Sequence, residues 1–146
     1  MFLSKTFGYA LRGVLYVAYI DKEGRKVQLD EMAEKLKVPR HFLAKIMKLM
    51  VKEGIMQSTK GPYGGFSLNE HTLKTKLIQL VRITEGVEQF NTCVLSLRKC
   101  NSQNPCPLHQ QMLELRDAML AEFSAKTLDD LLNSDDPDFI KSIATA

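Results

Sequence analysis

The sequence predicts a mainly α-helical chain that carries one small β-hairpin. Three observations lead to this fold class. Apolar residues recur at helical spacing in several segments, most clearly between Phe7 and Tyr19. Only the short turn 37–39 separates two of these segments. Residues 60–65 are rich in glycine and join two short strand-like stretches, as in a tight hairpin.

The first three helices are expected to follow one another closely. The first covers residues 7–19 and ends before the polar break 21–24. The second covers about residues 29–36, with two carboxylates in its first turn, where the positive end of the helix dipole favours them. The third begins at Pro39, which suits a first helical turn, and ends at Gly54, which suits a C-terminal cap.

The second half of the chain is expected to hold a hairpin, three further helices and a loop. In order, these are strands 55–59 and 66–68, a helix over 75–84 that closes at Gly86, a loop over 91–105, a long helix over 107–124 and a short helix that begins at Thr127. The Thr127 hydroxyl can cap that last helix. The acidic tail 133–146 is expected to be loose.

Composition and charge narrow the class of protein. Apolar residues make up 45% of the 146 residues and charged residues 25%, which is ordinary for a globular protein in water. No apolar run has the length of a membrane span, and the N-terminus lacks the order of a signal peptide, so we expect no membrane partner and a cytoplasmic location. Residues 1–106 carry a net charge of +8 and residues 107–146 carry −5, which suits a first part that meets a polyanion but also arises by chance.

Two helices joined by a tight turn and followed by a hairpin form the order of a winged helix-turn-helix, here over residues 1–86. The third helix has two unlike sides, which suits a helix that lies in the major groove of DNA with its back on the domain. The cationic side holds His41, Lys45, Lys48 and Lys52, and the apolar side holds Leu43, Ile46, Met47 and Met50. On an isolated helix, such a lysine stripe is more often a solvated face.

We predict two kinds of DNA contact from the third helix. Lys48 and Lys52 are assigned to phosphates, where contacts give affinity and salt dependence without sequence readout. The residues nearer the helix start are the candidates to reach base edges. They are Arg40, His41, Ala44 and Lys45.

The loop between the two strands is the most specific sequence in this half of the chain. Glycines permit positive φ and let the backbone approach a sugar–phosphate wall, and Pro62 stiffens the tip. Lys60 can reach the minor groove or a phosphate, and Tyr63 and Gly64 join it as candidate contacts. An ordinary hairpin turn would hardly need so many glycines beside a proline.

Three sequence features resemble the IscR/NsrR (Rrf-type) family of bacterial winged-helix repressors. They are the opening segment 3–12, the wing Lys-Gly-Pro-Tyr-Gly-Gly-Phe at 60–66 and a cluster of cysteines, and the resemblance extends to about Leu132. It implies a homodimer that binds a palindromic operator in double-stranded DNA and commonly represses transcription. Some members hold a 2Fe–2S or 4Fe–4S cluster through three cysteines and a variable fourth ligand, whereas others use no cluster.

The chain departs from the family pattern at three positions. Lys60 replaces the usual arginine at the start of the wing and keeps the charge without the planar fork. Ala44 stands where many members have a glutamate, so the operator preference is expected to differ. Gly8 occupies the position at which some members supply an acidic cluster ligand, and that route to a fourth ligand is closed here.

The cysteine loop, residues 87–106, is the candidate cluster site. Its cysteines are spaced Cys93-x6-Cys100-x5-Cys106, and His109 follows three residues later at a helix start. Thiolates are the preferred ligands of iron–sulfur clusters. Spacing and resemblance together favour a cluster on the three cysteines, with His109 as the candidate fourth ligand.

Other interpretations of the cysteines stay open. Zinc accepts three cysteines and a histidine, although its ligand pairs are usually closer in sequence. Thiol-based sensing without a metal, or inert cysteines in a member that has lost its cluster, also accounts for them. A structural disulfide is disfavoured because the cytosol keeps thiols reduced. In addition, three cysteines could not all pair within one chain.

The long helix is apolar on two sides. Together with the short helix that follows it, it forms the segment 107–132, which is expected to serve dimerisation. One stripe holds Leu108, Met112, Leu115, Met119 and Phe123, while Leu113 and Leu120 lie to one side of it. A helix with two apolar sides usually has two partners, here its own domain and a second chain. A single wide core face is the alternative.

The sequence thus predicts a DNA-binding transcriptional regulator, most readily a homodimeric repressor that senses iron–sulfur, redox or nitric oxide status, and not an enzyme. A cluster-free regulator or a protein-interaction module on the same fold is the alternative. A small metal- or redox-dependent enzyme is the third hypothesis, but the sequence lacks a cofactor glycine motif and a nucleophile–base pair.

Overall fold

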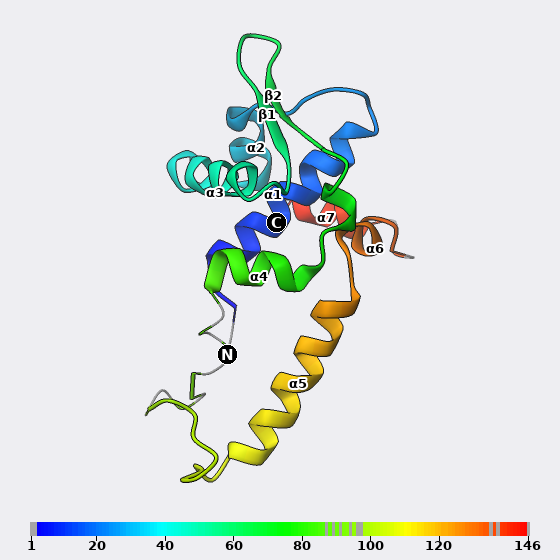
Figure 1. The fold of residues 1–146 in the computed structure, drawn as a ribbon. Coiled ribbons are helices and arrows are strands. Elements are labelled where there is room, and N and C mark those ends of the chain that lie inside the picture. Colours follow the sequence, from blue (N-terminus) through cyan, green and yellow to red (C-terminus); the bar gives the residue numbers. More distant parts are fainter. Residues whose placement is uncertain are drawn as a thin grey trace.

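The computed structural model describes residues 3–86, 88, 90, 92, 93, 95, 98–134, 136 and 138–145. It is mainly helical with one two-stranded antiparallel hairpin, as predicted (Figure 1). In chain order the elements are α1 (Lys5–Asp21), α2 (Leu29–Leu36), α3 (Arg40–Lys52), β1 (Gln57–Thr59), β2 (Gly65–Ser67), the 3-10 helix η1 (Thr72–Lys74), α4 (Leu77–Glu85), α5 (His109–Ala125), α6 (Leu128–Leu132) and α7 (Phe139–Thr145).

Helix α1 forms the centre of the core. Its buried residues include Val14, Leu15 and Val17, and the helix packs on both α3 and α4. Gly13 allows the close approach to α3, because a Cβ there would lie 2.9 Å from Met47 Sδ. The core therefore fixes α3 on the body of the domain from behind.

A charged network holds the start of α2 against α1. Arg25 donates to both carboxylate oxygens of Glu31, at 2.7 and 2.9 Å, and the Tyr16 hydroxyl donates to Glu31 Oε1 at 3.1 Å. Burial of the hydroxyl, and next its bond to Glu31, raises the pKa of Tyr16 to about 12. The bond from Arg25 holds the pKa of Glu31 below its usual range. This network sets the position from which the helix-turn-helix leaves α1.

The hairpin is tied to the domain through the segment before α2. Strands β1 and β2 pair in antiparallel register, and Phe66 exchanges two backbone hydrogen bonds with Val27, at 2.7 and 3.0 Å. Two side chains add to this, since Lys26 Nζ donates to Thr59 Oγ1 at 2.9 Å and Gln28 Nε2 donates to the Pro62 carbonyl at 3.0 Å. The wing is therefore held in place before any partner arrives.

Helix α5 begins away from the body of the domain, beside the cysteine loop, and runs back to it (Figure 1). None of its residues is fully buried. At its C-terminal end the chain rejoins η1 and α4, where Leu77 N donates to the Lys126 carbonyl and Leu128 N to the Thr75 carbonyl. Thr127 caps α6 as expected, accepting a hydrogen bond from the Asp130 N–H at 3.2 Å.

The end of the chain differs from the expected loose tail. Helix α7 packs on α1 and α2, with Ile143 only 9% exposed and with Phe139 and Ile140 half-buried against the core. The acidic residues precede this helix, and the apolar residues within it supply the packing. The tail is thus acidic at its start and folded at its end.

Candidate functional site

The outer face of α3 carries the basic side chains that the sequence predicted. His41, Lys45, Lys48 and Lys52 are all exposed. The opposite side supplies core, with Leu43, Met47 and Met50 at 0% exposure. The two-sided character of the helix is therefore present in the folded domain, whereas the DNA contacts themselves stay a prediction.

The start of α3 shows two features that the sequence did not reveal. Arg40 Nε forms an ion pair with Asp30 in the first turn of α2, so a base contact by Arg40 would have to share its guanidinium. The ring of Phe42 is 51% exposed and lies 4.3 Å from the His41 ring between centroids. On the helix, Phe42 lies between the basic side and the apolar side, so the spacing of residues did not assign it to either.

The tip of the wing presents one side chain fully to solvent. Tyr63 is 94% exposed, and Lys60 is also exposed. Gly64, in contrast, is buried. Only glycine fits at this position, because a Cβ would lie 2.1 Å from the Thr59 carbonyl oxygen. Gly65 has a φ of +142°, and its Cβ would lie 2.6 Å from the Val27 carbonyl oxygen. The glycines of the motif are thus explained by the turn and by its close approach to the domain.

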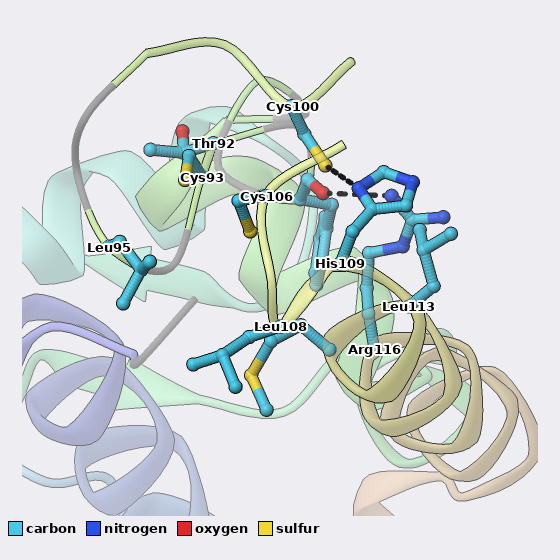
Figure 2. Close-up of a pocket in the computed structure, with 11 residues that line it drawn as sticks. Thr92, Cys93, Leu95, Cys100, Cys106, Leu108, His109, Leu113 and Arg116 are labelled. Carbon is cyan, nitrogen blue, oxygen red and sulfur yellow. Dashed lines mark hydrogen bonds between the residues drawn. The ribbon is translucent and has the colours of Figure 1, made fainter. Parts of the chain in front are cut away.

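The three cysteines and His109 line one cavity between the cysteine loop and α5 (Figure 2). Cys93 is buried, Cys106 is half-buried and Cys100 is exposed. Cys100 Sγ lies 3.3 Å from His109 Nδ1. The other ring nitrogen, His109 Nε2, is buried and has no hydrogen-bond partner among the described residues. The fold therefore brings together all four residues that the sequence marked as ligands.

This donor set suits an iron–sulfur cluster, although the cavity is narrow. Three thiols and one imidazole with an unpartnered nitrogen are the ligand types such clusters use. Within the described residues, no three metal-binding side chains are already arranged around one point. The cavity measures about 20 Å³, about the room of one water molecule, so the loop would have to open to take a cluster.

Helix α5 has one strongly exposed apolar side chain at its middle, because Leu115 is 60% exposed. Leu108, just before the helix, is 41% exposed and also lines the cysteine cavity. Near the other end, the Phe123 ring stacks on Phe7 with centroids 6.0 Å apart. The sequence placed Leu108, Leu115 and Phe123 on one stripe, whereas the structure packs Phe123 on the domain and leaves Leu115 exposed, so the two predicted apolar sides are not separated in this way. No helix in the described part of the chain is long and apolar enough to cross a membrane.

Comparison with known proteins gives relatives over nearly the whole chain. A candidate HTH-type transcriptional regulator of Aquifex aeolicus (strain VF5) is 35% identical over 135 residues, which cover 91% of this chain and 92% of the relative. Among solved structures, CymR, the global cysteine regulator of B. subtilis, matches with a TM-score of 0.74 and 21% identity, covering 93% of this chain and 99% of CymR. IscR of T. potens matches with a TM-score of 0.68 and 20% identity, covering 90% and 86%.

A family model described as Rrf2, iron-dependent transcriptional regulator, matches residues 3–134. This agrees with the family that the opening segment, the wing and the cysteines indicated. Helix α7 begins beyond the matched residues. The chain belongs to the Rrf2 family of transcriptional regulators, which are DNA-binding proteins rather than enzymes, as the sequence predicted.

Proposed function

We propose that the protein is a homodimeric repressor that reads an operator with α3 and the wing and senses iron–sulfur, redox or nitric oxide status at the cysteine cavity. The observation that carries the DNA part is the build of α3, whose basic side is exposed while its apolar side has no solvent access at Leu43, Met47 and Met50. The observation that carries the sensing part is the single cavity lined by three cysteines and His109.

In the DNA complex, α3 lies in the major groove. Lys48 and Lys52 bind phosphates, and the side chains at the helix start reach base edges. Arg40, His41, Ala44 and Lys45 make up that start. The wing reaches the neighbouring minor groove with Lys60 and Tyr63, whereas Gly64, predicted as a contact, is buried against Thr59 and shapes the turn. The ties to Val27, Lys26 and Gln28 support this role, because a wing already held in place loses little entropy on binding.

The dimer forms through the exposed apolar side of α5. A second copy covers Leu115, as expected for an isologous two-fold contact. The symmetry places two α3 helices on the same side of a duplex, about 34 Å or one turn apart. An operator with inverted repeats follows from this arrangement.

The cluster is held by Cys93, Cys100 and Cys106, with His109 as the fourth ligand. When bound, it supplies a redox-active centre whose charge and integrity change with oxidant, iron supply or nitric oxide. The chain itself contributes a change of position. The cysteine loop connects α4 to α5, and α4 packs on α1. Opening the loop therefore changes the position of α5 relative to the domain. Because α5 carries the dimer contact, the spacing of the two α3 helices changes with it.

The test is anaerobic purification followed by operator binding. Wild-type protein is expected to show visible absorbance that Cys100→Ala loses, and the cluster-loaded and cluster-free forms are expected to differ in affinity for an operator selected from genomic DNA. Equal affinity of the two forms would contradict the coupling. Ser102→Ala, in the same loop but not a thiol, is the matched control and should keep the absorbance.

A second candidate is a cluster-free regulator with the same DNA-reading element. It is favoured by one observation, the lack of a preformed arrangement of three metal ligands within the described residues. Protein that stays colourless after iron and sulfide reconstitution, yet still shifts operator DNA, would select this alternative.

A further inference from the structure

Arg116 brings a positive charge to the cysteine cavity. It lies seven residues after His109 on α5, which places both side chains on the same face of the helix. Both line the cavity with the three cysteines, and the view into the cavity shows them on the α5 side (Figure 2). Among the described residues that line this cavity, Arg116 is the only lysine or arginine, and none is a carboxylate.

The surroundings of Arg116 leave much of its charge to the cavity. The side chain is only 22% exposed. Its ion-pair partner is the next residue, Asp117, with Oδ1 at 3.2 Å from Nη2 and 3.3 Å from Nε. The Asp117 side chain is 68% exposed and does not line the cavity, so water screens the carboxylate more than it screens the guanidinium. The charge within the described cavity lining therefore comes from Arg116.

Arg116 also ties the cysteine loop to α5. Its Nη1 donates to the Phe90 carbonyl at 3.4 Å, just before the first cysteine. The residue thus connects the start of the cysteine loop with the helix that carries the exposed Leu115.

We propose that Arg116 is a further residue of the cysteine site, where it supplies a positive charge that attracts anionic groups to the cavity, a negatively charged cluster included, and positions the loop at Phe90. The identity of the bound group rests on the proposed function. The charge that Arg116 supplies does not, because it is also present at the cavity of the cluster-free protein. The role is one of positioning and charge, not of ligation.

The test compares two alkylating reagents that differ in charge, on the full-length cluster-free protein. Iodoacetate is anionic and iodoacetamide is neutral, and both react with the same thiolate. Their rate ratio at each cysteine, read by mass spectrometry, therefore cancels the fraction of thiolate and reports the local field. Arg116→Gln is expected to lower the ratio at Cys100 and Cys106 by roughly fivefold, as for loss of one nearby unit charge.

Three further variants make the result specific. Arg116→Lys keeps the charge and should restore most of the ratio. Asp117→Asn should raise the ratio, and it serves if Arg116→Gln does not fold. Lys126→Gln removes an exposed cation at the far end of α5 that does not line the cavity, and should leave the ratio unchanged. An unchanged ratio in Arg116→Gln, an equal fall in Lys126→Gln, or failure of Arg116→Lys to restore the ratio would each overturn the proposal.

A second measurement applies to cluster-loaded protein. Arg116→Gln is expected to shift the reduction potential to lower values, because loss of a positive charge disfavours the more negative reduced state, and Arg116→Lys should restore it. A potential that is the same in wild type and Arg116→Gln would contradict the proposal. If no cluster can be assembled, the proposed function fails, while the alkylation ratio still tests Arg116.

Discussion

The two ends of the molecule are built in opposite ways. At the DNA-reading end, the back of α3 is fully buried and the wing is fastened by backbone hydrogen bonds to Val27. At the other end, α5 has no fully buried residue, and Cys100 is exposed. A rigid element suits recognition of a fixed DNA shape, whereas a weakly packed element can change position when a ligand binds. The end that carries α3 and the wing is therefore preformed and α5 is loosely packed, which suits the roles proposed for the two ends.

The largest expected effect breaks the rigid end. Met47→Ala removes a fully buried side chain at the contact between α3 and α1 and should lower the free energy of unfolding by about 2–5 kcal/mol. Urea denaturation followed by circular dichroism measures it. Lys45→Ala on the exposed side of the same helix is the control, expected within about 0.5 kcal/mol of wild type. A loss below about 1 kcal/mol in Met47→Ala would mean that α3 is not seated as described.

The next largest effect is expected on the dimer, through a change confined to α5. Leu115→Asp places a charge on the exposed apolar side of α5 and should weaken the dimer by roughly tenfold or more, as for loss of an interface anchor. Analytical ultracentrifugation measures the dimer constant. Glu114→Ala, one residue earlier and exposed, should leave it close to wild type. Should Leu115→Asp instead stay fully dimeric, the dimer contact would lie elsewhere.

The smallest effect concerns the network that positions the helix-turn-helix. At neutral pH, Glu31→Gln should lower the free energy of unfolding by about 1 kcal/mol through loss of the Arg25 pair and the Tyr16 bond. Because the folded pKa of Glu31 is lowered, its contribution is present above the ordinary glutamate pKa and is lost as pH falls through the lowered pKa. The difference from wild type should therefore shrink in acid.

Tyr16→Phe is the matched control for this network. It keeps the Arg25–Glu31 pair, so its stability should fall in acid as wild type does. The pKa of Tyr16 is raised to about 12, so its contribution is present below the ordinary tyrosine pKa and is lost as pH rises through about 12. Denaturation curves at several pH values distinguish the variants. A constant gap between Glu31→Gln and wild type from neutral to acid pH would remove Glu31 from the network.

The helix-turn-helix and the wing could be predicted because each is encoded by local signals. The spacing of apolar residues marked α1 and α3, and the glycines at 61, 64 and 65 marked the hairpin. The site residues of this end were predicted by their place on the helix, although the ion pair of Arg40 with Asp30 depends on how α2 meets α3. The contact between α2 and α3 is set by tertiary packing, which cannot be predicted from the spacing of apolar residues.

The parts that were missed depend on distant contacts. Helix α7 spans only seven residues, too short to be stable alone, and it forms by packing Phe139, Ile140 and Ile143 on the core. Its acidic lead-in hid that pattern in the sequence. Nothing in the sequence singles out Arg116, and only the fold shows that it lines the same cavity as the cysteines. Spacing and the family resemblance together, by contrast, were enough to group the cysteines with His109.

The salt dependence of duplex binding tests the central claim most directly, namely that the basic side of α3, and not the cysteine loop, supplies the phosphate contacts. Cluster-free wild type, Lys48→Ala and Cys100→Ala are compared over a series of salt concentrations. Lys48→Ala should bind all duplexes more weakly, with a salt slope lower by about 1 for each bound protomer, and Cys100→Ala should keep the wild-type slope. An unchanged slope in Lys48→Ala, or a reduced slope in Cys100→Ala, would contradict the account.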